Sequence, residues 1–185
     1  EYKGLIISLF TLTAMASRPF SGKLADTVGR IPVMILGSTV CLICSLIYPT
    51  ISSIYGFFLL RFFHGFSTGF TPTGTTAYVA DVIPANRRGE AMGLLGTFGT
   101  VGMASAPAIG GWVAAEFSMN TMFFCSSFFG LLAILSFAGV RETLSSTEKF
   151  RNHHLKISKS DLYEPAVIVP FVVMLLSYYS YGVIL

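Results

Sequence analysis

The sequence predicts an all-α fold, a bundle of helices that crosses a membrane several times, and three observations predict it. Hydrophobic residues make up 53% of the chain and charged residues only 11%, whereas a soluble domain carries roughly 25% charged residues. The mean hydropathy is +0.70. The apolar residues gather in runs of about 20 residues, the length that spans a bilayer core. A polytopic membrane protein accounts for all three observations, and a soluble all-α protein does not.

Five apolar runs predict five helices within residues 1–140. The second run begins with Pro32, which the first turn of a helix tolerates. The third run is longer than a bilayer requires, and Pro72 with Gly69 and Gly74 predicts a bend in it. The fourth run is rich in glycine and the fifth in phenylalanine. The five predicted helices cover about 4–17, 32–50, 53–80, 89–115 and 120–140.

The polar connectors between these runs differ in charge. Most of the twelve Lys and Arg residues lie in the segments 18–31, 81–90 and 141–164, whereas the connectors near 48–55 and 116–119 hold none. Because positive charge stays in the cytosol, the three basic segments are predicted to face the cytosol. Residues after 164 then form a sixth span, 165–185. Since loop position explains the basic residues, no nucleic acid partner is expected.

The first basic connector carries charge and glycine in a fixed pattern, Gly22-x-x-x-Asp26-x-x-Gly29-Arg30. If it winds helically, Gly22, Asp26 and Arg30 share one face, where the carboxylate and the guanidinium can pair. The two glycines allow a sharp turn and the close approach of another helix end. This stretch resembles the signature loop between the second and third helices of major facilitator superfamily transporters, and all four fixed positions match. The alternative interpretation is a generic polar turn.

Asp81 and Arg88 bracket the second basic connector, which resembles the Asp…Arg-Gly segment that follows the fourth helix in the same superfamily. The resemblance places both residues beside Asp26 and Arg30, in a cluster of two carboxylates and two guanidiniums. Partly dehydrated pairs can hold one conformation and release it when a charge is neutralised, as a switching transporter requires. The alternative is a set of solvated loop charges, each worth less than about 1 kcal/mol.

Arg61 and His64 lie within the third apolar run, in a stretch that resembles the fourth-helix pattern Arg-x-x-Gln-Gly, with His64 in place of Gln. An arginine inside a span costs at least about 2.5 kcal/mol, so it usually faces a polar cavity or a partner. A role in coupling at the central cavity is therefore one interpretation of Arg61; snorkelling to the outer interface is the other. His64 either carries a proton or replaces the amide of Gln as a hydrogen-bonding group.

The fourth run contains small residues at helical spacing around a proline, in a stretch that resembles the fifth-helix motif Gly-x-x-x-Gly-Pro-x-x-Gly-Gly of the superfamily's proton-exchanging exporters. Its members are Gly102, Ala106, Pro107, Gly110 and Gly111. Only Ala106 departs from the motif. The small residues predict a smooth face on which another helix packs closely, and the proline predicts a bend.

These resemblances cover nearly the whole chain and imply an internal fragment of the superfamily fold, from about the second to the seventh transmembrane helix. Residues 1–140 would be part of the amino-terminal half, 141–164 the cytosolic linker between the halves, and 165–185 the start of the carboxy-terminal half. The resemblance also implies alternating access around a site near the bilayer midplane, with ion coupling in place of ATP.

We expect a proton-coupled exporter of small molecules, active in multidrug or metabolite efflux. An importer on the same fold and a non-transporting receptor or scaffold are the alternatives. The expected partners are the lipid bilayer, a small-molecule substrate and protons, and the expected location is the cell membrane. No enzymatic activity, cofactor or metal is expected, because the sequence lacks a nucleotide-binding loop and a ligand cluster. Cys41 and Cys44 are expected to be core residues, and His153 and His154 to be solvated.

Overall fold

The computed structural model describes residues 3–151, 154, 156–157, 165, 168–169 and 172–176. The described part is all-α, which confirms the predicted fold class. Its helices are α1 (Lys3–Thr27), α2 (Arg30–Ile47), α3 (Ile54–Val82), α4 (Arg88–Glu116) and α5 (Met119–Ala138), with short 3-10 turns η1 (Tyr48–Thr50) and η2 (Ala85–Arg87). His153 and most of the predicted sixth span, 165–185, lie outside the described residues.

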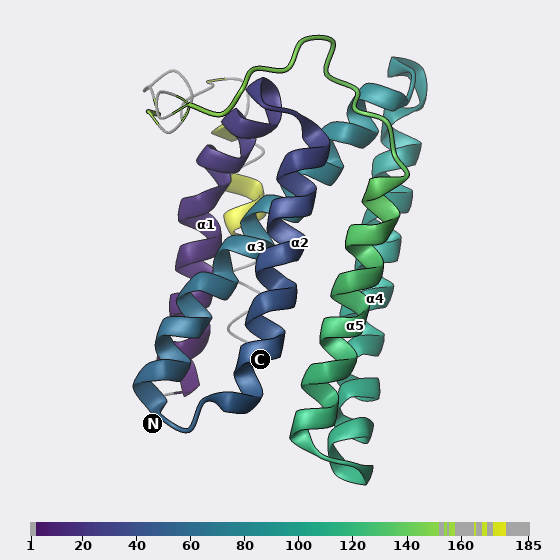
Figure 1. The fold of residues 1–185 in the computed structure, drawn as a ribbon. Helices are drawn as coiled ribbons and strands as arrows, with labels where there is room; N and C mark the ends of the chain where they lie inside the picture. The colour runs from purple at the N-terminus through teal and green to yellow at the C-terminus, as the bar shows by residue number, and fades with distance from the viewer. Residues whose placement is uncertain are drawn as a thin grey trace.

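Helices α1, α2 and α3 form a closely packed group, α5 is attached to this group through α2, and α4 is held more loosely. α3 lies against both α1 and α2, and α5 packs on α2 (Figure 1). α4 lies beside α5, makes few contacts with α3, and has Val113 as its one buried residue. Two clusters of buried apolar side chains hold the packed group together, Leu24, Ala25, Val33 and Phe70 in one and Cys44, Tyr48 and Leu60 in the other.

Three of the described helical segments are long and apolar enough to cross a membrane, judged by length and composition. They are Arg30–Thr50, Ala85–Glu116 and Met119–Ala138. α1 and α3 contain 25 and 29 residues, which is sufficient length for a span. Both carry charged residues, and α3 is rich in threonine as well. That α1 and α3 also cross the bilayer stays a prediction from the sequence.

α1 is longer than the predicted helix. It continues past Ser17 to Thr27, so the predicted connector 18–31 is mostly helical. Charged side chains mark where a chain leaves hydrocarbon, but they do not end a helix; a change of backbone conformation does. That change occurs at Gly29, whose φ of 137° is open to glycine and strained for other residues. Arg30 is therefore the first residue of α2 and does not share a helix with Asp26.

The glycines of α3 pack against neighbouring helices. A Cβ atom at Gly65 would lie 2.6 Å from the carbonyl oxygen of Phe10 on α1, and one at Gly74 would lie 2.6 Å from Cγ of Met34 on α2. Only glycine allows such close approach. The bend predicted from Pro72, Gly69 and Gly74 does not interrupt α3, which runs as one α-helix from Ile54 to Val82.

Candidate functional site: a charged junction and an arginine among aromatic rings

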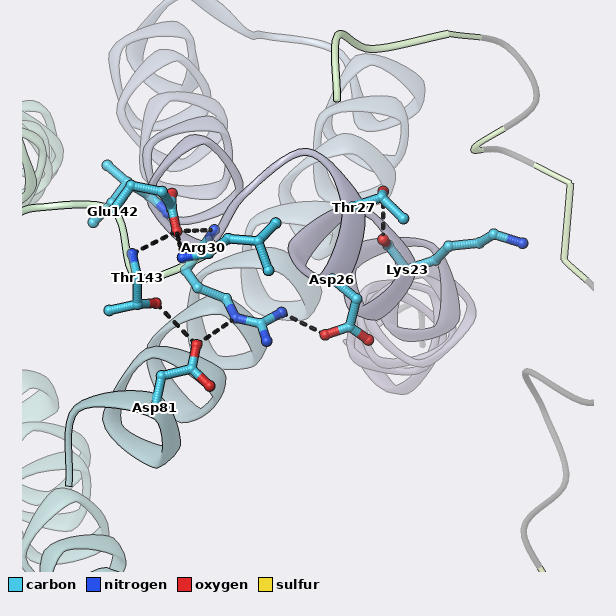
Figure 2. A network of polar contacts seen from close by, with 9 residues as sticks. Lys23, Asp26, Thr27, Arg30, Asp81, Glu142 and Thr143 are labelled. Atoms are coloured by element: carbon cyan, nitrogen blue, oxygen red, sulfur yellow. Dashed lines mark hydrogen bonds and ion pairs between the residues drawn. The ribbon is translucent and has the colours of Figure 1, made fainter. Parts of the chain in front are cut away.

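Three connectors distant in sequence meet at one end of the bundle, where the segment after α5 crosses towards α1 (Figure 1). We call the side chains that meet there the charged junction; they are Asp26, Arg30, Asp81, Glu142 and Thr143. Figure 2 shows the Arg30 guanidinium between two carboxylates, with Nη1 paired to Asp26 and Nε 3.0 Å from Oδ2 of Asp81. The Arg30 side chain is 11% exposed, whereas Asp26 is 69% and Asp81 33% exposed.

Asp81 receives two donors on a single oxygen. Its Oδ2 accepts a hydrogen bond from Nε of Arg30 at 3.0 Å and another from the Thr143 hydroxyl at 2.9 Å. The hydrogen bond from Arg30 lowers the pKa of Asp81; partial desolvation opposes this, and the Thr143 hydroxyl and the charges of Arg30 and Arg88 reinforce it. The net result is a pKa below the ordinary value of an aspartate, so Asp81 stays ionised.

Glu142 binds backbone rather than side chains. Its Oε1 accepts from the N–H groups of Arg30 at 3.0 Å, Thr143 at 2.9 Å and Leu144 at 3.1 Å, and its Oε2 accepts from Ile31 at 2.9 Å. Desolvation raises the pKa of this carboxyl, but the four backbone hydrogen bonds together outweigh it and leave the pKa lowered. A carboxylate at the N-terminus of α2 also complements the helix dipole.

The predicted members of the junction do not all take the predicted places. Gly29 turns the chain, as predicted, but the close neighbour it admits is Glu142, whose Oε2 would lie 2.6 Å from a Cβ at this position. A Cβ at Gly22 would meet nothing within 4 Å. Arg88 makes no ion pair or hydrogen bond with the described residues, and its charge reaches Asp81 only at longer range. The junction therefore contains one guanidinium, where the sequence led us to expect two.

Arg61 lies in a different kind of environment. Its guanidinium carbon is 5.7 Å from the ring centroid of Phe10 and 5.5 Å from those of Tyr48 and Phe57. Within the part of the chain that the structure describes, its buried Nε has no hydrogen-bond partner. Three aromatic faces stabilise the cation by cation–π attraction, about 0.5–2 kcal/mol each depending on desolvation. Arg61 is thus held inside the helix group by rings.

His64 stands one helical turn from Arg61 and has a protein partner at each ring nitrogen. Nδ1 lies 3.1 Å from the hydroxyl oxygen of Tyr48, and Nε2 lies 3.7 Å from Sγ of Cys41. A neutral imidazole accepts at one nitrogen and donates at the other, so it can satisfy both contacts at once. This arrangement fits a hydrogen-bonding role for His64.

The glycine-rich face of α4 lines a cavity. The cavity has a volume of about 620 Å³ and is bounded by Tyr48, Arg61 and His64 on one side and by α4 and α5 on the other. All five residues of the predicted packing motif line it, namely Gly102, Ala106, Pro107, Gly110 and Gly111. A Cβ at Gly110 would lie 3.7 Å from Met122, and one at Gly102 would meet nothing within 4 Å. No described helix packs closely on this face.

An all-helical chain with apolar segments of membrane-spanning length, in which most charges lie in or beside the connectors, defines a multi-pass membrane protein. The sequence profile of the Major Facilitator Superfamily matches residues 1–185, and the chain belongs to this family. The family consists of integral membrane transporters rather than enzymes.

Curated relatives of this chain include several multidrug resistance proteins, one of which is named an efflux pump. The "Multi-drug resistance efflux pump PmrA" of Streptococcus pneumoniae is 34% identical over 149 residues, 80% of this chain and 37% of the relative. "Multidrug resistance protein 1" of Bacillus subtilis is 26% identical over 179 residues, 97% of this chain and 46% of the relative. "Multidrug resistance protein MdtG" of Salmonella arizonae is 30% identical over 170 residues, 91% and 42%. The chain thus spans less than half the length of these relatives.

Sequence reasoning missed Glu142 and Thr143 as members of the junction, and Phe10, Tyr48 and Phe57 as the surroundings of Arg61. A usable signal existed for Glu142, because a carboxylate directly after an apolar run stands at the same membrane surface as the other basic connectors. The three aromatic residues gave no such signal, since aromatic side chains occur in every apolar run of this chain.

Proposed function

We propose that this chain is part of a transporter that exports small molecules by alternating access and exchanges them for protons. In this proposal the charged junction is a latch that stabilises one conformation, and Arg61 takes part in coupling. We place the substrates in the multidrug or metabolite class, and the names of the multidrug resistance relatives support the multidrug part of this proposal. The mechanism requires the two halves of the superfamily fold to move against each other around a shared site.

The shared guanidinium of Arg30 carries the proposal. It joins the end of α1 to the end of α3 through two carboxylates while belonging to α2 itself. Because Asp26 and Asp81 keep contact with water, each pair contributes only about 0–1 kcal/mol. A contact of this strength holds a conformation and also lets it go, as a latch in a cycling transporter must. Charges that served only to stabilise the fold would not need to join three helix ends.

Arg61 and His64 support the coupling part of the proposal. A cation among apolar residues is costly, and the Arg61 side chain borders the cavity. Its buried Nε has no hydrogen-bond partner among the described residues, so it can donate to a group that enters the cavity. A guanidinium in this position responds electrostatically when a proton or a charged substrate enters the cavity, because interactions are stronger away from water.

The test uses the full-length protein reconstituted in vesicles that enclose a fluorescent lipophilic dye. An imposed proton gradient should drive dye movement above a protein-free control. Arg30→Ala should slow this movement by at least about tenfold while leaving dye binding nearly unchanged, because a latch affects switching more than affinity. Arg87→Ala is the matched control; it also removes an arginine paired to a carboxylate at the same membrane face, but Arg87 pairs within its own connector, with Glu90.

Dye movement that ignores the proton gradient would remove proton exchange from the proposal. If Arg30→Ala abolished dye binding while the switching rate stayed the same, the junction would not be a latch. No dye movement with any substrate tested, in a protein that folds and binds, would favour the receptor or scaffold alternative.

A further inference from the structure

Glu142 supplies hydrogen-bond acceptors that the residues next to the N-terminus of α2 do not provide. The residue before this helix is Gly29, which has no side chain and therefore cannot cap the helix itself. The first N–H groups of a helix have no partner within it and need an acceptor from elsewhere. Glu142, 112 residues later in the chain, accepts from the first of these groups, that of Arg30, and from the next, that of Ile31.

The same carboxylate also fixes its own segment. Its Oε1 accepts from the backbone N–H groups of Thr143 and Leu144 as well as from Arg30, so one carboxylate joins the start of α2 to the start of the segment after α5. Gly29 keeps the space for this contact open, since any Cβ there would clash with Oε2. A second backbone contact lies just beyond, where the N–H of Glu148 donates to the carbonyl of Thr27 at 2.9 Å.

Thr143 connects this backbone contact to the ion pairs. Its hydroxyl donates to the oxygen of Asp81 that also accepts from Nε of Arg30 (Figure 2). Arg30 is therefore held twice, by its backbone N–H on Glu142 and by its side chain on Asp81. The residue that follows Glu142 holds Asp81 from the other side. The contacts form a closed ring of Arg30, Glu142, Thr143 and Asp81.

We infer that Glu142 and Thr143 are positioning residues of the latch, so that the segment 141–151 is released together with the Arg30–Asp81 ion pair. The inference rests on the proposed function of the junction as a latch. A closed ring of contacts opens as a unit, because breaking any one contact removes the geometry that supports the next. The segment that follows α5 would then report and restrain the conformation of the junction.

A simple cap predicts something different. If Glu142 only capped α2, replacing the Arg30 side chain would leave its backbone N–H, and hence the contact with Glu142, in place. The segment after α5 would not move. Coupling predicts that Arg30→Ala loosens this segment as Glu142→Gln does, although Arg30→Ala leaves every acceptor of the cap intact.

The experiment places spin labels at Ser146 and Glu116 of the full-length protein, with native cysteines replaced, and measures their distance distribution by pulsed electron paramagnetic resonance. Glu116 lies just before the start of α5, and Ser146 lies in the segment that crosses from the far end of α5 towards Thr27, so the two labels are separated by the length of α5, about 30 Å, and by this crossing segment. We expect a narrow distribution in the unmodified protein. Glu142→Gln and Arg30→Ala should each lower the ratio of narrow to broad population by about tenfold, the effect of losing a hydrogen bond to a charged group. The double variant should lose little more than either single one.

Glu90→Gln is the matched control, because Glu90 is likewise a carboxylate at the N-terminus of a helix, here α4, and contacts an arginine, Arg87. Among the described residues it accepts no hydrogen bond from the backbone of another segment. This control variant should leave the distribution narrow. Thr143→Val keeps the cap and removes the hydroxyl, so it should give a smaller shift in the same direction. This variant decides the question if Glu142→Gln does not fold.

The inference is overturned if Arg30→Ala slows transport while the Ser146 label stays narrow, or if Thr143→Val leaves the distribution unchanged. These outcomes differ from failure of the proposed function. If the unmodified protein does not transport but its variants loosen the segment together, the ring of contacts is correct and the latch belongs to another activity.

Discussion

Arg30 and Arg61 both come from motifs that resemble those of the superfamily, and the fold surrounds them in opposite ways. Arg30 stands at a helix end between two partly hydrated carboxylates, and its backbone is held as well. Arg61 stands inside the helix group, against three aromatic faces, with a buried nitrogen that has no partner among the described residues. The charge of Arg30 is balanced by carboxylates, whereas the charge of Arg61 is stabilised by aromatic rings.

The two environments predict different roles. Arg30 contributes to the stability of its surroundings, whereas Arg61 is placed to respond to charge in the cavity. Removing one partner of a charge pair leaves the other partner uncompensated, so Arg30 is bound into the stability of its surroundings. Arg61 has no carboxylate partner among the described residues, so its removal would leave no described carboxylate uncompensated, and we expect Arg61 to contribute little to stability. In the proposed function, a role in the transport cycle accounts for the free-energy cost of a charge among apolar residues, since the electric field of Arg61 would act on any charge that enters the adjoining cavity.

The same substitution at both sites tests this comparison most strongly. We expect Arg61→Leu in the full-length protein to lower proton-driven transport by at least about tenfold, and to leave the melting temperature unchanged or raise it, because an apolar side chain suits the ring-lined site. Arg30→Leu should lower the free energy of unfolding by about 1 kcal/mol, a value limited by the exposure of Asp26 and Asp81. Transport in vesicles and thermal unfolding followed by tryptophan fluorescence measure the two effects.

Arg61→Lys serves as the control for charge, because a lysine still stands over the rings while it loses the planar fork. It should retain more transport than Arg61→Leu. Full transport in Arg61→Leu would show that the arginine is only accommodated. A large loss of stability in Arg61→Leu would mean that it has an anionic partner beyond the described residues.

His64 offers a smaller test of the ring-lined site. Since Tyr48 and Cys41 occupy its two nitrogens, a neutral hydrogen-bonding group should replace it. We expect His64→Gln to keep transport within about threefold and to leave its pH profile between pH 6 and 8 unchanged. His64→Ala, which keeps neither contact, should lower transport further. A flattened pH profile in His64→Gln would instead assign proton transfer to the imidazole.

Local sequence patterns predicted the helices well, because runs of apolar residues are a property of neighbours in the chain. They predicted the end of α1 poorly. The charges after Ser17 indicate where the chain reaches water, whereas the helix ends where Gly29 takes a positive φ. The two events coincide only when a helix ends at the membrane surface, and α1 continues past the first of these charges to Thr27.

The spacing of glycines predicted that helices pack closely, but it did not identify the helix on which this packing occurs. The motif around Gly102 and Gly110 predicted it for α4, whose glycine face lines the cavity instead. Close packing occurs on α3, at Gly65 and Gly74, where α1 and α2 approach. The partner of a small-residue face depends on the arrangement of several helices, so spacing within one helix does not contain it.

Glu142 illustrates the same limit for polar contacts. Its four hydrogen bonds join segments that are far apart in sequence, and its charge alone did not distinguish it from the other acidic residues of the connectors. The resemblance to the superfamily indicated Asp26, Arg30 and Asp81 as neighbours. It also indicated Arg88, but this residue lies apart from the ion pairs. Arg88 is the first residue of α4, a helix that has few contacts with α3.

The smallest effect we predict is that acidification has no influence on the junction between pH 8 and about pH 5. Two carboxyls of the junction, Asp81 and Glu142, have pKa values below the ordinary values of their residue types. A carboxyl with a lowered pKa contributes stability above its unfolded pKa and loses it only as the pH falls through its folded pKa, which lies below the ordinary carboxyl value of roughly 4. The other charged groups near Asp81 are Arg30 and Arg88, and Asp26 pairs with Arg30.

Spin labels at Ser146 and Glu116 should therefore give the same narrow distribution at pH 8 and pH 5.5, and a broader one only below about pH 4. The prediction that His154 is solvated is wrong, because the residue is 1% exposed. Its Nε2 lies 2.9 Å from Glu148 in the same segment, so His154→Gln is measured in parallel as the control for this nearby imidazole. Broadening between pH 8 and 5.5 that persists in His154→Gln would contradict the lowered pKa values. If the junction stays closed over this range while transport varies with pH, proton sensing lies away from the junction, and the ring-lined arginine and its cavity are the place to search for it.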